Sequence, residues 1–251
     1  MIKDVTPSPT TTLEMRHEQL AKGNQLLAGL LDEHELAWWQ EAQQRLEPTA
    51  DAKTGALLSS LCKRHLREQA VPDSPAWSTI ELARVLLMAQ VLVHQPHEEV
   101  LRQLFHWGDD REKAALLKAL DWFDRHGSCL ELALLAGRTS NPQVFAALAL
   151  DTPYPLRHYP ERAFQQLVLK ALGMGLDVSR LVGLEQRHGV DLNQLALDLL
   201  DEQLAAERAV SPGLPRLIAF DLLSPAQRQR LAGLYQQQRL PTEWREYLAE
   251  P

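Results

Sequence analysis

The chain has 251 residues, enough for one large domain or two small ones, and a chain of this length can bury well over half of its unfolded surface. Its composition, 45% hydrophobic and 24% charged, is typical of a globular protein and argues against general disorder and against an integral membrane protein. The 33 acidic residues outnumber the 26 basic ones, and the net charge of −7 argues against a nucleic-acid partner.

Cysteine usage and the first residues bear on location. The only cysteines, Cys62 and Cys129, form no C-x-x-C pair, which favours a reduced compartment. Residues 1–11 lack the apolar core of a secretion signal, and we expect them to form a disordered tail. No apolar run approaches the roughly 20 residues that span a bilayer. We therefore expect a cytoplasmic protein that does not span a membrane.

Helix-start signals recur along the chain, and strand-like alternation is absent. Ser78-x-x-Glu81 and Ser128-x-x-Glu131 both fit the capping box, in which the hydroxyl and the carboxylate each accept a backbone N–H at the helix start. Prolines suit the first turn of a helix because their missing N–H has no helical partner there. Four prolines are predicted at such positions: Pro96, Pro142, Pro160 and Pro225.

These signals predict an all-α fold. In chain order, the predicted helices cover residues 13–31, 33–46, 51–68, 79–93, 96–107, 110–124, 129–138, 142–150, 160–173, 178–187, 191–208, 214–222, 225–238 and 243–249. Caps of alternate helices lie 31, 32, 36 and 34 residues apart, at Ser78, Asp109, Asn141, Asp177 and Ser211. This spacing favours antiparallel helical hairpins stacked as an α-α superhelix. An irregular multi-helix bundle is the alternative.

Composition shifts divide the predicted helices into three regions. The proline-containing segment 71–75 could be a linker between an N-terminal helical hairpin region at 12–70 and a more apolar helical domain at 75–222. Residues 223–251 are predicted to form C-terminal helices that dock on the main domain, since short free helices are unstable in water.

Catalytic and metal-binding motifs are hard to find in this sequence. No dinucleotide fingerprint, P-loop, H-E-x-x-H or G-x-S-x-G occurs. His94 and His97 are weak metal candidates, because zinc needs three or four ligands in fixed geometry. His106 and Asp109 could form an acid-base pair, but such residues are more often a C-terminal histidine beside an N-capping aspartate. No cofactor is predicted.

Three sequence features point to ligand binding. The segment 151–160 holds Tyr154 and Tyr159 among three prolines, which stiffen the backbone and favour either a recognition loop or two tyrosines plugging a groove between helices. Arg84 and Lys170 lie within apolar stretches. Each either extends its charge outward along apolar surface or faces an internal cleft that an anionic ligand or a buried carboxylate completes.

An ordered set of segments resembles the EboA-domain family over about residues 75–215. The segments are Trp77-Ser78-Thr79-Ile80-Glu81-Leu82-Ala83-Arg84, Leu104-Phe105, Arg138-Thr139, Val144-Phe145-Ala146-Ala147-Leu148-Ala149, Pro153-Tyr154-Pro155 and Val168-Leu169-Lys170-Ala171. Two positions depart from the pattern: Thr152 and Ser140 stand where the family usually has asparagine. Any role of those asparagines is therefore in doubt in this chain.

The resemblance implies a cytoplasmic helical protein from clusters linked to traffic of secondary metabolites or their precursors toward the cell envelope. Such clusters resemble sets encoding a prenyltransferase-like membrane enzyme, a metal-dependent hydrolase-like protein and sugar-isomerase-like or cyclase-like enzymes. We expect a non-catalytic adaptor or small-molecule carrier. Its partners would be a metabolite, proteins of the same cluster, or both, at the inner membrane surface. Its groove would be lined by Arg84, Arg138, Tyr154, Tyr159 and Lys170.

Two alternatives stay open at this point. One is an enzyme acting on a prenylated or aromatic metabolite in a helical cavity, where His106 and Asp109 move protons. The other is a scaffold that binds only proteins.

Overall fold

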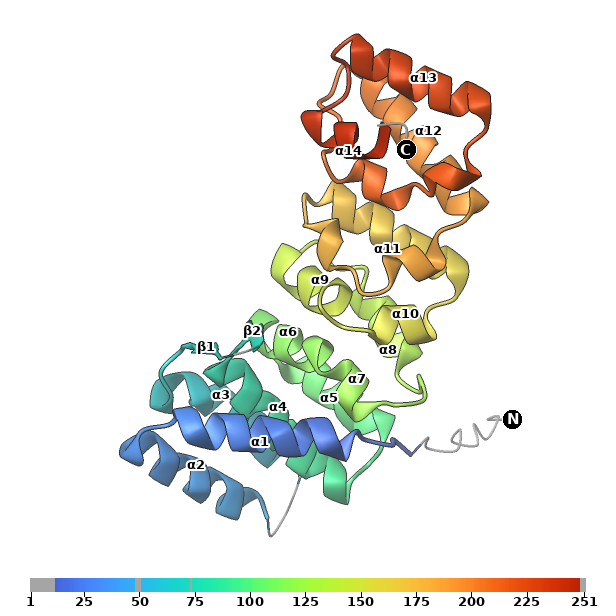
Figure 1. Ribbon diagram of the computed structural model, residues 1–251. Coiled ribbons are helices and arrows are strands. Elements are labelled where there is room, and N and C mark those ends of the chain that lie inside the picture. The colour runs from blue at the N-terminus through green and yellow to red at the C-terminus, as the bar shows by residue number, and fades with distance from the viewer. Residues whose placement is uncertain (1–11, 48–50, 73, 249–251) are drawn as a thin grey trace, which may run out of the picture. The chain divides into compact units, whose positions relative to one another are not determined.

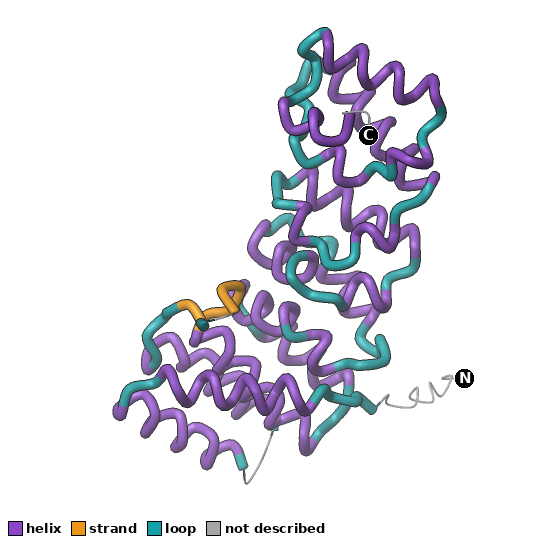
Figure 2. Tube along the Cα trace, in the orientation of Figure 1, coloured by secondary structure: helices purple, strands orange, loops and turns teal. Residues whose placement is uncertain are grey.

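The structure is a computed structural model that describes residues 12–47, 51–72 and 74–248. The tail predicted at residues 1–11 lies outside the described residues. Within them are fourteen α-helices, five 3-10 helices and one two-stranded sheet (Figures 1 and 2). The predicted all-α fold is confirmed, and stacking into a superhelix stays a prediction. The chain divides into two compact units, residues 1–148 and 149–251.

The first unit is built around one apolar helix. Its elements are α1 (His17–Leu30), α2 (Glu33–Leu46), α3 (Ala52–His65), β1 (Ala70–Val71), β2 (Ser74–Ser78), α4 (Thr79–His94), α5 (Glu98–Trp107), α6 (Asp110–Lys118), α7 (Leu120–Phe123), α8 (Leu130–Ala136) and α9 (Pro142–Ala149). Helix α4 packs against α1, α2, α3 and α6. Buried residues lie all around it, as expected of a helix that is apolar on every side.

A glycine permits the closest of these packings. A Cβ at Gly55 of α3 would lie 2.6 Å from the Val91 side chain of α4, so a larger residue would push the two helices apart. The missing side chain therefore sets how closely α3 approaches α4.

Two predicted capping boxes have different outcomes. The box at Ser78 is confirmed, because its hydroxyl accepts from the Glu81 N–H at 3.2 Å and the Glu81 carboxylate accepts from the Ser78 N–H at 2.9 Å. The box at Ser128 is wrong, because α8 begins at Leu130 without a side-chain cap. Asp124 instead accepts from the N–H groups of Ser128 and Cys129 at 3.0 and 2.6 Å.

The four prolines predicted in first turns of helices fall into two groups. Pro142 and Pro225 begin helices α9 and α13, as predicted. Pro96 and Pro160 precede their helices, which start at Glu98 and Glu161. The prolines thus mark the helix starts to within two residues.

The segment expected to be a linker forms the small sheet. Strands β1 and β2 are antiparallel, with Ala70 opposite Ser78 and Val71 opposite Ser74 (Figure 2, orange). Helices α1, α2 and α3, which precede the sheet, pack in the same compact unit as α4. Strand β1 has two residues, too few for the alternation that identifies a strand in a sequence, and the sequence of β2 contains a proline, which argues against a strand.

The second unit uses shorter elements. They are α10 (Tyr154–His158), α11 (Glu161–Gly173), η1 (Val178–Arg180), η2 (Leu184–Arg187), α12 (Val190–Ala205), η3 (Leu214–Leu217), η4 (Phe220–Leu222), α13 (Pro225–Gln236), η5 (Thr242–Trp244) and α14 (Arg245–Leu248), where η denotes a 3-10 helix. The single helices predicted at 178–187 and 214–222 are each two 3-10 helices. Gly183 interrupts the first pair with a left-handed φ of 72°.

Two further local predictions fail in this unit. The proline-containing segment predicted as a stiff loop contains the five-residue helix α10. Ser211 does not cap a helix with its side chain, because η3 begins after Gly213. Both pieces are too short to show a helical period of apolar residues.

The C-terminal helices pack against their own unit. Trp244 is completely buried and meets the Phe220 ring edge-on, with centroids 6.4 Å apart. Tyr247 stacks on the same ring at 5.5 Å. Phe220 therefore anchors α14 and η5 through aromatic contacts.

Candidate functional site

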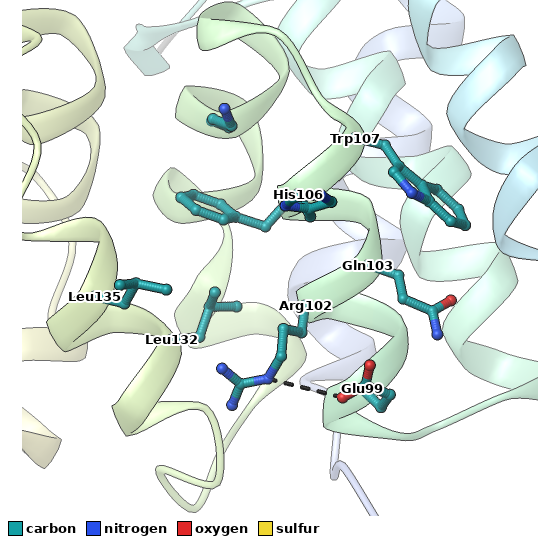
Figure 3. Close-up of a pocket in the computed structure, with 9 residues that line it drawn as sticks. Glu99, Arg102, Gln103, His106, Trp107, Leu132 and Leu135 are labelled. Carbon is teal, nitrogen blue, oxygen red and sulfur yellow. Dashed lines mark ion pairs between the residues drawn. The ribbon is translucent and has the colours of Figure 1, made fainter.

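A pocket of about 410 Å³ lies on the first unit, between α5, α6 and α8 (Figure 3). Nine residues from these helices line it: Glu99, Arg102, Gln103, Phe105, His106, Trp107, Lys113, Leu132 and Leu135. Its volume falls in the range of small-molecule sites. All nine residues belong to one compact unit, so this unit alone forms the pocket.

Helical spacing explains why α5 supplies most of the lining. The helix buries Val100, Leu101 and Leu104 against the core. Arg102 and His106 lie four residues apart, so both project from the part of the helix that does not enter the core. In Figure 3 they point to the same side of α5 as α8. A single amphipathic helix thus presents one face to the core and another to the pocket.

Helix α8 supplies the apolar wall. Leu132 is 1% exposed and Leu135 is 50% exposed, so the wall extends from the core to the surface. Figure 3 shows both leucines facing α5 across the pocket. Trp107, which is 46% exposed, projects from the other side of α5 in this view and lies at the pocket edge. An open site with large exposed apolar side chains is a candidate for ligand or protein binding.

The charges are arranged unevenly around this wall. Arg102 is paired with Glu98 at 3.3 Å and with Glu99 at 3.8 Å. Lys113 of α6 places its ammonium 5.6 Å from the centre of the Phe105 ring, a cation-π contact. The arginine is therefore engaged at the N-terminal end of α5, and the lysine stands over an aromatic side chain.

His106 lies in this pocket, but its predicted partner, Asp109, makes its contacts with other residues. The Asp109 carboxylate accepts from the Glu112 N–H at 2.9 Å and caps α6, as predicted from its position. Its other oxygen lies 3.9 Å from Lys63 Nζ. Among the described residues, no hydrogen bond or ion pair joins His106 to Asp109. The proton-moving role of this pair stays a prediction.

The weak metal candidates lie at the junction of α4 and α5. His94 ends α4, and His97 is the N-cap residue of α5, with a buried Nδ1 that has no hydrogen-bond partner among the residues described. Within the ranges that the structure covers, no three histidine, cysteine or acidic side chains gather in a way that could hold a metal ion. The two histidines remain weak candidates only.

Arg84 is buried in the first unit. It is 1% exposed, and its Nε donates to the Ser59 carbonyl oxygen at 3.3 Å. Its Nη2 is buried without a hydrogen-bond partner in the described part of the chain. The same region holds Glu112, which accepts from the Ser59 hydroxyl at 3.2 Å, and Cys62, whose thiol pKa burial raises to about 12. The side chain therefore points inward, the second of the two orientations that the sequence allowed.

The other four predicted ligand-binding residues are split between the units. Arg138 is exposed after α8 in the first unit. In the second unit, Tyr154 begins α10 and is fully buried, Tyr159 directly follows that helix and is 4% exposed, and Lys170 lies in α11. The Tyr159 hydroxyl has no hydrogen-bond partner among the described residues, and burial raises its pKa. The five-residue set stays a prediction.

Sequence reasoning identified only His106 among the pocket residues. Arg102, Lys113 and the two leucines come from three helices, and nothing local in the sequence joins them. The available signal was the amphipathic pattern of α5, whose outer stripe carries Arg102 and His106 at helical spacing.

The fold and pocket define an all-α protein with a site of small-molecule size on its first compact unit. The chain matches the family model described as metabolite traffic protein EboA over residues 58–219. It belongs to this family, which confirms the resemblance found in the sequence and gives it a role in metabolite traffic in general. No curated protein and no solved structure matches it.

The segment that the family model matches includes the whole pocket. All nine pocket residues lie within the matched residues 58–219.

Among the described helices, none has both the length and the apolar character required to cross a bilayer.

Proposed function

We propose that this protein is a non-catalytic carrier that binds a small metabolite in the pocket between α5, α6 and α8 and passes it on chemically unchanged. The cargo would be a secondary metabolite or its precursor, moved in the cytoplasm toward the cell envelope, with enzymes of the same cluster as partners. The observation that carries this proposal is the pocket of about 410 Å³ in a chain whose family is described by metabolite traffic.

Two features of the pocket favour binding over chemistry. The surface that its walls expose is mainly apolar, and covering apolar surface gains free energy by excluding water whatever the cargo's reactivity. The acid-base candidate that the sequence placed here, His106, has no bond to its predicted partner Asp109 among the described residues, and Asp109 is used for helix capping. An enzyme that acts on the cargo is the alternative, and a protein scaffold that uses exposed Trp107 and Leu135 is the other.

The experiment is purification of the full chain from its native cell, followed by mass spectrometry of bound small molecules. Leu135→Trp should fill the pocket and reduce the bound molecule at least tenfold. Leu57→Trp is the matched control, because Leu57 is a similarly exposed leucine on α3 that does not line the pocket. Wild-type protein that carries nothing, or equal loss in both variants, would contradict the proposal.

Two further variants separate the alternatives. His106→Ala should alter at most the amount of cargo and leave its chemical identity unchanged, whereas an enzyme would accumulate unconverted substrate. Lys170→Gln tests the residue set predicted from the sequence. If this variant loses the cargo and Leu135→Trp does not, the metabolite binds to that set and not to the α5, α6 and α8 pocket.

A further inference from the structure

The chemistry of the pocket specifies its ligand further, on the condition that the proposed function holds. The arginine and the lysine that line it differ in the number of acidic side chains that they contact. Arg102 is held by Glu98 and Glu99 at 3.3 and 3.8 Å. In the stretches of chain that the structure covers, Lys113 makes a cation-π contact with Phe105 and no ion pair. Lys113 is therefore the pocket cation that has a charge left to neutralise.

The acidic side chains nearest to Lys113 along the chain are used elsewhere. Asp109 caps α6 through the Glu112 N–H, and the Asp110 carboxylate accepts from the Asn141 side chain at 2.7 Å. Glu112 is itself buried and returns its carboxylate to the Asp109 N–H at 2.9 Å. These hydrogen bonds account for the three carboxylates, and in the part of the chain that the structure describes none of the three forms an ion pair with Lys113.

Apolar surface adjoins this charge. Phe105 lies 5.6 Å from the ammonium, and Leu132 and Leu135 form the wall that faces α5 in Figure 3. A ligand that covered only the apolar wall would bury Lys113 beside it without a counter-charge, which costs free energy. A ligand that met only Lys113 would leave half-exposed Leu135 in water. One molecule satisfies both features if it carries an anionic group beside an apolar part.

We infer that the pocket binds an amphipathic organic anion. Its apolar ring or chain packs against Phe105, Leu132 and Leu135, and its carboxylate, sulfonate or phosphate group pairs with the Lys113 ammonium. The pairing selects anionic cargo over a neutral molecule of the same shape, because the apolar contacts are equal for both.

Two fluorescent probes with nearly the same rings separate charge from shape: anilinonaphthalene sulfonate, which is an anion, and phenylnaphthylamine, which is neutral. Both are titrated into the full chain at neutral pH. Lys113→Gln should raise the Kd of the anionic probe about fivefold, within the range of a partly exposed charge pair, and leave that of the neutral probe unchanged. Added salt should weaken the binding of the anionic probe only.

Lys53→Gln is the matched control, since it removes an exposed lysine of α3 with the same change in net charge. This control should leave the Kd of both probes unchanged. Equal effects of Lys113→Gln and Lys53→Gln, or equal effects of Lys113→Gln on both probes, would overturn the inference while pocket binding stands. If Leu135→Trp does not reduce the fluorescence of either probe, neither probe occupies the pocket. That result would overturn the proposed function instead.

Discussion

The two compact units differ in how many of their described helices begin with a side-chain cap. In the first unit, polar side chains cap the helix that follows them within three residues. Five caps of this kind are found among its described residues: Asp32, Asp51, Ser78, Asp109 and Asn141. The described residues of the second unit hold two, Asp177 and Ser224. Side chains also reach backbone groups far along the chain in both units, as Arg84 does at the Ser59 carbonyl oxygen in the first. Arg187 donates to the carbonyl oxygens of Leu156 and Tyr159 at 2.6 and 3.1 Å, and Asn193 pairs with Ala219.

The difference follows from the kind of helix in each unit. All five 3-10 helices of the described residues lie in the second unit. Such short turns leave many N–H and C=O groups without a helical partner, and buried groups of this kind require another one. Distant side chains supply those partners in the second unit. We therefore expect the loss of a distant partner to cost more stability than the loss of a local cap.

The largest expected effect is that of Asn193→Ala. The Asn193 amide donates to the Ala219 carbonyl oxygen at 2.9 Å and accepts from the Ala219 N–H at 2.7 Å, and all of these atoms are buried. The substitution leaves two backbone groups unsatisfied and should lower the free energy of unfolding by about 3 kcal/mol. Hydrogen exchange read by peptide should show faster exchange in residues 149–248 than in the first unit.

Its control is the neighbouring Gln194→Ala, which removes an exposed hydrogen bond to Asp198. That change should stay within about 0.5 kcal/mol of the wild type. Similar losses for the two substitutions would show that the Asn193 contacts do not hold the second unit together.

Glu35, a residue of the first unit, is both a local and a distant partner, so it tests both kinds of interaction at once. Its carboxylate accepts from the Asp32 N–H at 3.0 Å and from the Arg67 N–H at 2.7 Å. Hydrogen bonds from the Arg67 side chain, followed by those backbone bonds, lower its pKa from 4.5 to about 2 despite burial. The carboxylate therefore stabilises the fold at neutral pH.

The sign of its pH dependence is fixed by that lowered pKa. The stabilisation is complete above about pH 4.5, the pKa of the unfolded chain, and is lost as the pH falls toward 2. Glu35→Gln should cost about 1–2 kcal/mol at neutral pH, a value reduced for the exposure of Arg67. Urea unfolding of both proteins should give a difference that shrinks between pH 4.5 and 2. A difference independent of pH would contradict the assignment.

The smallest effects separate the two Ser-x-x-Glu sequences. Ser78→Ala removes an observed cap of α4 and should cost about 1 kcal/mol. Ser128→Ala should change stability by less than about 0.5 kcal/mol, because Asp124 satisfies the N–H groups at that helix start. Thermal unfolding of the pair measures the difference. Equal destabilisation would show that Ser128 acts as a cap after all.

Local chemistry in the sequence determined the helical class and most helix starts in the first unit. Caps at Ser78 and Asp109 and the prolines at 142 and 225 could be recognised because a cap acts within three or four residues of its own position. Such interactions are present in any window of the sequence. The EboA family match was also predictable, since ordered segments along the chain carry it.

Tertiary structure decided the features in which distant residues meet. The inward orientation of Arg84 depends on α3 covering it. Strand β1 and helix α10 are too short to show a period in the sequence, and β2 contains a proline. The pocket required Leu132 and Leu135 of α8 to face Arg102 and Lys113 from two other helices. The apolar periodicity of a helix predicts which of its faces is buried. It does not predict which element covers that face, because the hydrophobic effect has no directional preference for a partner.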